Sequence, residues 1–370
     1  METIQINKQP DTVAAAKKPK LLWLATGGTI ASAPGPDGLE PELTYEGMAR
    51  YLPPSSIHAD ITSREILRLD SSNIQPEDWV LMAGEIAQAA GDYDGIIITH
   101  GTDTLAYSAA MLSFMLQGYP LPVVLTGSQL PITDPLTDAI SNLSTAFAMA
   151  SSGVPGVFVA FDRKVIFGTR AVKTKTLDFA AFESINAVPV AQINAEGLVF
   201  EPSYSEVLEE RKRSASEEHF TLKDEVDDSV FLIKLIPGLD PKIFSMLRTA
   251  GYRGLVIEAF GIGGLHYLYR DQVSAVEELM NAGMPVVVTS QCLYERSDFS
   301  IYATGKKLLD KGAIQAFDMT TEAAVTKLMW ALGQTEDPQK VRNIFQRSLA
   351  WEISLPQVHE AADQQTVEGE

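Results

Sequence analysis

The feature that most restricts the fold of this chain is a series of short, uninterrupted apolar runs. Four of them lie in the first half, at residues 21–25, 95–99, 122–126 and 157–161. Runs of this length are typical of parallel strands that are covered on both faces. Helical spacing of apolar residues lies between them, at 76–90 and 105–116. The alternation predicts an α/β protein with a doubly wound, mostly parallel sheet.

The same alternation returns after a charged interruption. Residues 203–228, SYSEVLEERKRSASEEHFTLKDEVDD, lack glycine and are rich in charge, which is typical of a linker or a solvent-facing excursion. Beyond them, VFLIKLI, GLVIEAFG and PVVVTSQ predict strands, and residues 240–249 and 271–282 predict helices. A chain of 370 residues is also long enough for two domains. We therefore expect a disordered lead-in at 1–20, a larger N-terminal domain at 21–205, a charged linker at 206–228, a smaller C-terminal α/β domain at 229–356 and a tail at 357–370.

Composition excludes several classes of function. The formal net charge of -19 disfavours nucleic acids and anionic membranes as partners. The single cysteine, Cys292, rules out an intrachain disulfide and a cysteine metal cluster. The first twenty residues lack the apolar core of a signal peptide, and the apolar stretch after them is shorter than the about 20 residues that a bilayer requires. We expect a soluble, cytoplasmic protein.

Two glycines flanked by threonines end the first apolar run, in the segment ATGGTIAS. Thr26 and Thr29 bracket Gly27 and Gly28 where the predicted strand stops. Glycine permits positive φ and close backbone approach, so such a turn can present the next hydroxyl and N–H group at the sheet edge. The segment alone is equally compatible with a plain glycine turn. Neither GxGxxG nor GxxxxGK[ST] is present, so nucleotide binding is not predicted.

A second apolar run ends in the same way, now beside an acidic residue. In DGIIITHGTDTLAYSAAML the strand-like residues are followed by His100 and Gly101, and helical spacing begins at Leu105. Thr102 and Asp103 therefore lie at a strand-to-helix switch, where N–H groups and the helix dipole favour negative charge. An aspartate in this place can also be a simple helix N-cap. Two strand ends that both present Gly-Thr favour a catalytic site over two unrelated turns.

The pair TGGTIAS and HGTDTLAYSA resembles the two signature segments of the bacterial-type L-asparaginases, which hydrolyse the side-chain amide of asparagine. The resemblance continues through LDSSNIQPEDW, LTGSQLPITDPLTDAISNL, RAVKTKTLDFAAFES and TSQCLYERSDFSIYATGKKLLDKGAI, and so covers most of the chain. The cytoplasmic type I group is the most similar. The resemblance implies an active site in the N-terminal domain, a homodimer or homotetramer, and hydrolysis of L-asparagine to L-aspartate and ammonia through an acyl-threonine, with no cofactor and no metal.

The family's functional residues can be carried onto matching positions of this sequence. The resemblance assigns catalytic roles to Thr29, Thr102, Asp103 and Lys173. It assigns substrate binding to Asp70, Ser71, Ser72, Thr102 and Asp103. A threonine hydroxyl is a weak nucleophile until a base takes its proton and nearby donors stabilise the oxyanion. Lysine accepts a proton at neutral pH only if burial favours its neutral form, and a neighbouring carboxylate opposes this.

Two positions depart from the family pattern. Leu39 stands where type I relatives often carry a lid tyrosine that assists the nucleophile. Tyr45, Glu40 or a group from another subunit are the alternatives, so the sequence leaves open which group activates the nucleophile. Gly264, in GIGGLH, stands where relatives often have asparagine. Cys292 matches a segment associated with effector binding in type I relatives, but we expect a buried, inert cysteine.

Two other functions compete with this hypothesis. The ammonia-generating subunit of a tRNA-dependent amidotransferase shares these signatures, but it normally carries an additional N-terminal β-domain, whereas fewer than thirty residues precede Thr29. The acidic charge also does not suit tRNA. A non-catalytic amino-acid-binding protein is favoured only by Leu39. The histidines form no HExxH pattern and no GxSxG elbow is present, so neither a zinc hydrolase nor a serine hydrolase is predicted.

Overall fold

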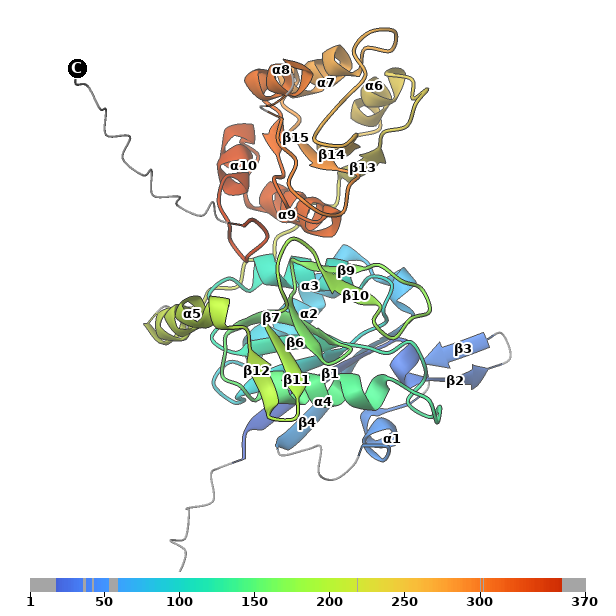
Figure 1. Cartoon of the computed structure of the whole chain (residues 1–370), viewed down its shortest axis with the longest axis vertical. Coiled ribbons are helices and arrows are strands. Elements are labelled where there is room, and N and C mark those ends of the chain that lie inside the picture. The colour runs from blue at the N-terminus through green and yellow to red at the C-terminus, as the bar shows by residue number, and fades with distance from the viewer. Residues whose placement is uncertain are drawn as a thin grey trace, which may run out of the picture.

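The chain folds into two α/β domains, of which the N-terminal one is the larger (Figure 1). The structure is a computed structural model that describes residues 18–35, 38–41, 43–52, 59–217, 219–299, 301 and 303–354. Both domains are built on sheets of parallel strands with helices against them. The fold class predicted from the alternating apolar runs is confirmed.

The N-terminal domain contains an eight-stranded sheet with the order β12-β11-β8-β7-β6-β5-β1-β4. Its strands are β1 (Lys20–Gly27), β4 (Asp60–Leu69), β5 (Gly95–Thr99), β6 (Pro122–Thr126), β7 (Gly156–Phe161), β8 (Lys164–Phe167), β11 (Ala191–Asn194) and β12 (Gly197–Phe200). The strands from β4 to β7 are parallel, and β8, β11 and β12 extend the sheet antiparallel. All four runs that were predicted as strands belong to this sheet.

Helices cover both faces of this sheet. The helices α2 (Pro76–Gln88) and α3 (Leu105–Met115) contribute to the core on one face, and α4 (Ala139–Ala150) contributes to the core on the other. Within β1, Leu22 and Leu24 belong to the first core, whereas Leu21 and Trp23 belong to the second. Side chains alternate between the two faces of a strand. A strand covered on both faces is therefore apolar at successive positions, as β1 is from Leu21 to Ala25.

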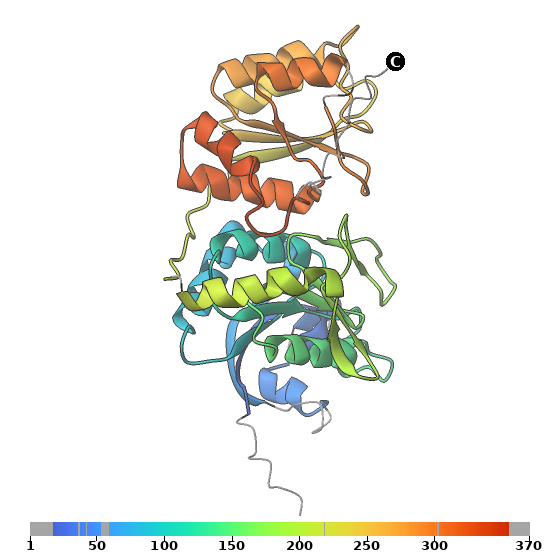
Figure 2. The same ribbon diagram turned by 60° about the vertical axis from the view of Figure 1, so that its left-hand side comes forward.

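Shorter elements surround the sheet. They are η1 (Thr29–Ala31), β2 (Ser32–Gly35), β3 (Gly38–Pro41), α1 (Tyr45–Ala49), η3 (Ser71–Asn73), β9 (Ala171–Lys173), β10 (Phe182–Ser184), η4 (Pro202–Tyr204) and α5 (Ser205–Glu217). The strands β2 and β3 pair antiparallel, as do β9 and β10. Residues 206–228, expected as a charged linker, thus begin with a helix. Figure 2 shows α5 lying across the N-terminal domain, and Leu208 packs into the core beneath it.

The C-terminal domain contains a four-stranded parallel sheet with the order β13-β14-β15-β16. Its strands are β13 (Val230–Lys234), β14 (Gly254–Ala259), β15 (Val286–Ser290) and β16 (Ile314–Gln315). Its helices are α6 (Lys242–Thr249), α7 (Gln272–Asn281), α8 (Ala303–Lys311), α9 (Thr321–Gln334) and α10 (Pro338–Phe345). The three strands and two helices predicted for this half are confirmed within a few residues at their ends.

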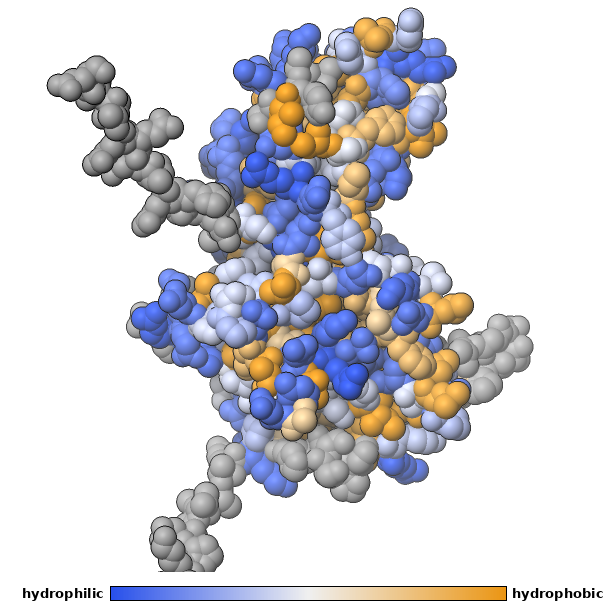
Figure 3. All heavy atoms as spheres, in the orientation of Figure 1, coloured by the Kyte–Doolittle hydropathy of each residue, from blue (hydrophilic) through white to orange (hydrophobic). Residues whose placement is uncertain are grey.

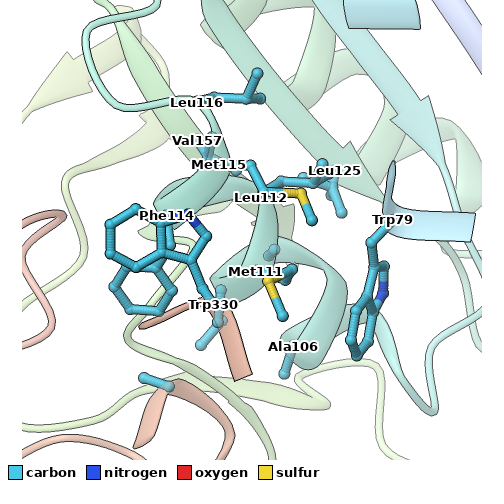
Figure 4. Packing of buried hydrophobic residues seen from close by; sticks show 14 of the residues in the cluster. Trp79, Ala106, Met111, Leu112, Phe114, Met115, Leu116, Leu125, Val157 and Trp330 are labelled. Carbon is cyan, nitrogen blue, oxygen red and sulfur yellow. The ribbon is translucent and has the colours of Figure 1, made fainter. Parts of the chain in front are cut away.

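One hydrophobic core continues from the N-terminal domain into the C-terminal domain. Helix α3 of the first domain and helix α9 of the second face each other at the junction (Figure 1). Phe114 of α3 stacks on Trp330 of α9 with ring centroids 6.2 Å apart, and Met111 and Leu112 lie in the same cluster (Figure 4). Aromatic pairs of this kind add about 0.5–1.5 kcal/mol beyond the area that they bury.

Two buried ion pairs fasten the segment after α10 to the rest of the molecule. Lys327 of α9 lies 2.6 Å from Glu352, and both side chains are fully buried. Glu352 also accepts hydrogen bonds from the backbone N–H groups of Leu349 and Ala350. Arg170, three residues before Lys173, forms the second pair, with Asp318 at 2.9 Å. Because Arg170 also donates to the Trp351 carbonyl, this segment is bound to both domains.

The variant Glu352→Gln is expected to lower the free energy of unfolding by about 3–5 kcal/mol, because it leaves the Lys327 charge buried without its counter-ion. Urea denaturation compared with wild type measures this loss. Glu336→Gln is the control, since Glu336 is 89% exposed in its pair with Arg253 and is expected to cost less than about 1 kcal/mol. Equal midpoints for Glu352→Gln and Glu336→Gln would contradict the structural role of the buried pair.

The surface mixes hydrophilic residues with small groups of apolar ones on the face that Figure 3 shows. Isolated apolar side chains are normal on protein surfaces. Among the helices in the described part of the chain, none has the length and the apolar character that crossing a membrane requires.

Candidate active site

Three neighbouring strands, β4, β1 and β5, end at the same edge of the N-terminal sheet. Their carboxyl ends lead into the loop at residues 70–72, the turn at Thr29 and the turn at Thr102. The chain passes from β1 to β4 on one side and then to β5 on the other, which makes this place a topological switch point. Open α/β sheets bind ligands outside the carboxyl ends of strands at such points. This edge is the candidate active site.

Gly27 and Gly28 bring the turn after β1 against both neighbouring turns. Their φ angles are +103° and +81°. A Cβ atom on Gly27 would lie 2.5 Å from the Leu69 carbonyl oxygen, and one on Gly28 would lie 2.4 Å from Gly101 Cα. A side chain cannot occupy such a space, so close approach of the backbones requires both glycines. The residues that follow Gly28 and Gly101 are the two threonines of the predicted site, which therefore lie on adjoining turns.

Ser71 ties the loop after β4 to the turn after β5. Its hydroxyl oxygen accepts a hydrogen bond from the Asp103 N–H group at 3.2 Å, and its carbonyl accepts one from the Thr104 hydroxyl at 2.7 Å. Asp70 accepts bonds through one carboxylate oxygen from the N–H group and the hydroxyl of Ser72, both at 2.8 Å. Ser71 is buried, whereas Asp70 and Ser72 are exposed. Ser71 thus braces the site, and the other two side chains face solvent at its edge.

Lys173 contacts both Thr102 and Asp103. It ends β9, and its Nζ atom lies 2.7 Å from Thr102 Oγ1 and 2.6 Å from Asp103 Oδ1. The Lys173 side chain is 18% exposed and that of Asp103 is 63% exposed. The lysine is thus shielded behind the two residues it contacts, while the carboxylate can also meet a ligand. A lysine Nζ atom in this position holds the Thr102 hydroxyl in a defined orientation through their hydrogen bond.

His100 forms a hydrogen-bonded chain behind the turn. Its Nδ1 atom lies 2.7 Å from the Gly101 carbonyl oxygen, which can only accept, so Nδ1 carries the proton. Nε2 then accepts from the Ser108 hydroxyl at 2.9 Å, and Ser108 in turn accepts from Trp79 Nε1 at 2.9 Å. This chain fixes the peptide group that precedes Thr102. The sequence presents the histidines only as possible metal ligands, so this role of His100 was missed.

Burial lowers the pKa of His100 from 6.5 to about 4. Between these values the unfolded chain binds a proton that the folded chain does not, so the stabilisation is complete above pH 6.5 and falls as the pH drops towards 4. We expect the free energy of unfolding to decline by a few kcal/mol over this interval, as measured by urea denaturation. In the variant His100→Asn, the free energy of unfolding is expected to depend less steeply on pH over this interval. His219→Gln, which replaces an exposed histidine, is the control and is expected to keep the wild-type pH dependence. Equal slopes for wild type and His100→Asn would refute this assignment.

Further sequence expectations concern the residues around the predicted lid, Cys292 and metal binding. The side chains of Leu39, Glu40 and Tyr45 lie outside what the structure describes. The expectation of a buried Cys292 is wrong, because this residue is exposed in the loop that follows β15. Within the described ranges, no group of three or more histidine, cysteine or acidic side chains is placed to hold a metal ion.

Two family models match the chain, one for each domain. A family model described as "Asparaginase, N-terminal" matches residues 20–204, and a second, "Glutaminase/Asparaginase C-terminal domain", matches residues 229–345. The chain therefore belongs to the asparaginase family of enzymes.

Individual relatives support this assignment. The chain is 43% identical over 339 residues to an L-asparaginase of Thermococcus kodakarensis, covering 90% of this chain and 99% of the relative. It is 36% identical over 347 residues to a subunit of the glutamyl-tRNA(Gln) amidotransferase of Pyrococcus abyssi, covering 91% of this chain and 77% of the relative. The solved thermostable L-asparaginase from Thermococcus kodakarensis superposes with a TM-score of 0.82 at 42% identity, covering 90% and 99% of the two chains. L-asparaginase I from Vibrio cholerae gives 0.79 at 27% identity, covering 92% and 100%.

Proposed function

We propose that this protein is an L-asparagine amidohydrolase, which converts L-asparagine to L-aspartate and ammonia. One observation carries the proposal: three adjacent strand ends bring the turn of Thr29, the loop at 70–72 and the turn of Thr102 and Asp103 to one edge, where Lys173 of β9 contacts Thr102 and Asp103. The similarity to an L-asparaginase over 90% of the chain supports the same substrate.

The reaction proceeds through an ester on Thr29. Its hydroxyl oxygen attacks the side-chain amide carbon, and N–H groups of the two glycine-threonine turns stabilise the oxyanion. The carbon–nitrogen bond then breaks, and the proton taken from the hydroxyl leaves with the nitrogen as ammonia. Water hydrolyses the ester to give the aspartate carboxylate and restores the threonine.

Thr102, linked to Lys173, carries the proton in this scheme. The two groups are already at hydrogen-bond distance, which general acid–base catalysis requires. Asp103 has a different role, which is substrate binding. One of its carboxylate oxygens is engaged by Lys173, and its 63% exposure leaves the other oxygen accessible to the ammonium group of an amino acid. The exposed carboxylate of Asp70 offers a second partner for the same group.

The variant Tyr45→Phe is expected to leave kcat unchanged, because it removes one oxygen that the scheme does not use. Steady-state ammonia release compared with wild type tests this. A fall of about a hundredfold or more would instead assign general acid–base catalysis to Tyr45, since such groups contribute about 10²–10⁴-fold.

The experiment that tests the proposed function is ammonia release by the purified protein, with L-asparagine and L-glutamine in parallel. Release from asparagine is expected. The amidotransferase subunit is the second candidate, on the strength of 36% identity over most of this chain. Release that appears only when tRNA and a partner subunit are added would favour it. Calorimetric binding of asparagine without any release would favour a non-catalytic binding protein, and absence of both would overturn the proposal.

We also propose that the protein is cytoplasmic and forms a homodimer or homotetramer. A solved relative 27% identical to this chain is described as a probable cytoplasmic L-asparaginase from Campylobacter jejuni, with a TM-score of 0.73. Light scattering of the active protein tests the oligomeric state, and a fully active monomer would refute it.

A further inference from the structure

A cavity of about 430 Å³ lies between α5, the N-terminal domain and the segment after α10. Its wall includes Leu116 after α3, Val157 of β7, Phe167 of β8, Arg211 of α5 and Trp351 of the terminal segment. This volume lies within the range of about 300–1,000 Å³ that is usual for small-molecule sites. The loop after α10, red in Figure 2, reaches from the C-terminal domain towards α5. The cavity is thus lined by elements that are far apart in the sequence.

The cavity is separate from the candidate active site. Thr102 and Asp103 precede the first turn of α3, whereas Ser113 and Leu116, which line the cavity, lie at its last turn. Eleven helical residues rise about 16 Å, since each adds 1.5 Å. The two sites therefore lie at opposite ends of α3, and a ligand in one does not touch the other.

Arg211 is the notable polar group of this cavity. Its guanidinium carbon lies 5.7 Å from the Phe167 ring centroid and 5.4 Å from that of Trp351. Those two rings stack on each other at 5.1 Å with an interplanar angle of 6°. Gly156 makes room for the charge, because a Cβ atom there would lie 2.9 Å from a guanidinium nitrogen. Burial lowers the pKa of Arg211 to about 10, so it is still a cation at neutral pH.

The guanidinium of Arg211 has hydrogen-bond donors to offer a ligand. In the part of the chain that the structure describes, no oxygen accepts a hydrogen bond from its guanidinium and no carboxylate pairs with it. Contact with an aromatic face uses the face of the guanidinium, whereas its five N–H groups lie in its plane. Glu352, the carboxylate that acts on it electrostatically, is already bound to Lys327 and two backbone N–H groups. A planar donor fork in a cavity is suited to one carboxylate.

The remaining wall indicates what else the ligand carries. Leu116, Val157 and Ile353 supply apolar surface. Ser113, Gln117 and Ser348 donate to carbonyls of the protein itself, and among the described residues that line the cavity Arg211 is the one with a cationic side chain. Glu210 lines the cavity and is exposed, so the local charge suits a single negative charge better than a phosphate dianion.

We propose that this cavity is a second ligand site, which binds a small monocarboxylate with an apolar, ring-sized body through Arg211. Its occupant contacts α3, α5 and the terminal segment together. Because that segment accepts hydrogen bonds from Thr169 and Arg170, a bound ligand stabilises the contact between the two domains.

The test is calorimetric titration of the full-length protein with phenylacetate, in excess L-aspartate so that the proposed catalytic site is occupied. Phenylacetate is expected to bind at one site per chain and to raise the melting temperature. Phenylacetamide, which has the same shape without the charge, is expected to bind at least about tenfold more weakly, because the charge-assisted bonds are lost. Inorganic phosphate is expected to bind more weakly than phenylacetate.

The matched variants are Arg211→Gln and Arg213→Gln, which change two arginines of the same helix. Arg213 is exposed and does not line the cavity. Arg211→Gln is expected to lose at least about tenfold in phenylacetate affinity, and Arg213→Gln is expected to match wild type. Equal binding of phenylacetate and phenylacetamide to wild type, no binding of phenylacetate, or unchanged affinity in Arg211→Gln would each overturn the proposal. The comparison of phenylacetate with phenylacetamide uses the wild-type protein. It therefore tests the proposal even if Arg211→Gln fails to fold.

Discussion

Replacing Thr29 by alanine is expected to lower kcat for asparagine by at least about ten-thousand-fold, because the oxygen that forms the ester with the substrate is lost. Thr29 begins η1, directly after the glycine pair that fits against the neighbouring turns. The close backbone contacts are made by Gly27 and Gly28, so the substitution leaves them intact. Ammonia release measures the effect, and an unchanged melting temperature is expected to accompany it.

The matched control is Thr29→Ser, which keeps the hydroxyl and removes one methyl group. It is expected to retain a substantial part of the activity, so that the contrast between serine and alanine isolates the oxygen. A Thr29→Ala variant with more than about one hundredth of the wild-type rate would be incompatible with a covalent role, because loss of a nucleophile typically costs far more. Thr29 would then be a structural part of the turn.

The strands that are buried on both faces could be predicted from sequence, and the edge strand β4 could not. β1, β5, β6 and β7 are apolar at nearly every position because helices cover both sides of the sheet. The edge strand β4 reads DITSREILRL, and its residues are exposed or only partly buried. No apolar run marks it, although it leads into Asp70. The helix α5 was also missed, because its charged residues are typical of a linker when read without the core beneath Leu208.

Some residues of the candidate site could likewise be predicted from the sequence, and others could not. Thr29 and Thr102 could be found because each follows a glycine at a predicted strand end. Lys173 is 71 residues away from Thr102 and lies in the segment KTK, where nothing local distinguishes it from a surface lysine. Only the family resemblance pointed to it. His100 and Arg211 act through contacts that the fold creates, with Ser108 and with the rings of Phe167 and Trp351. No sequence pattern encodes such contacts.

The variant Lys173→Met is expected to lower kcat by about a thousandfold, within the range of general acid–base catalysis. The thioether has nearly the length of the lysine side chain but neither donates to Thr102 nor balances the charge of Asp103. The proton path from Thr102 is therefore cut, and the hydroxyl loses the donor at 2.7 Å that orients it. KM is expected to rise less than kcat falls, because the exposed Asp103 oxygen is still available to the substrate. Steady-state kinetics at several asparagine concentrations separate the two parameters.

Lys175→Met is the control, since this lysine lies two residues further on, is 43% exposed and pairs only loosely with Asp178 at 3.7 Å. It is expected to keep the wild-type rate. If Lys173 merely holds the β9–β10 pair in place, Lys173→Met would lower the melting temperature, and the conservative variant Lys173→Arg would restore both stability and rate. If it exchanges protons with Thr102, Lys173→Arg is expected to restore stability but little of the rate, because a guanidinium stays protonated in proteins. Wild-type kcat in Lys173→Met would remove Lys173 and Thr102 from the proton path and return that role to Tyr45 or to a group from another subunit.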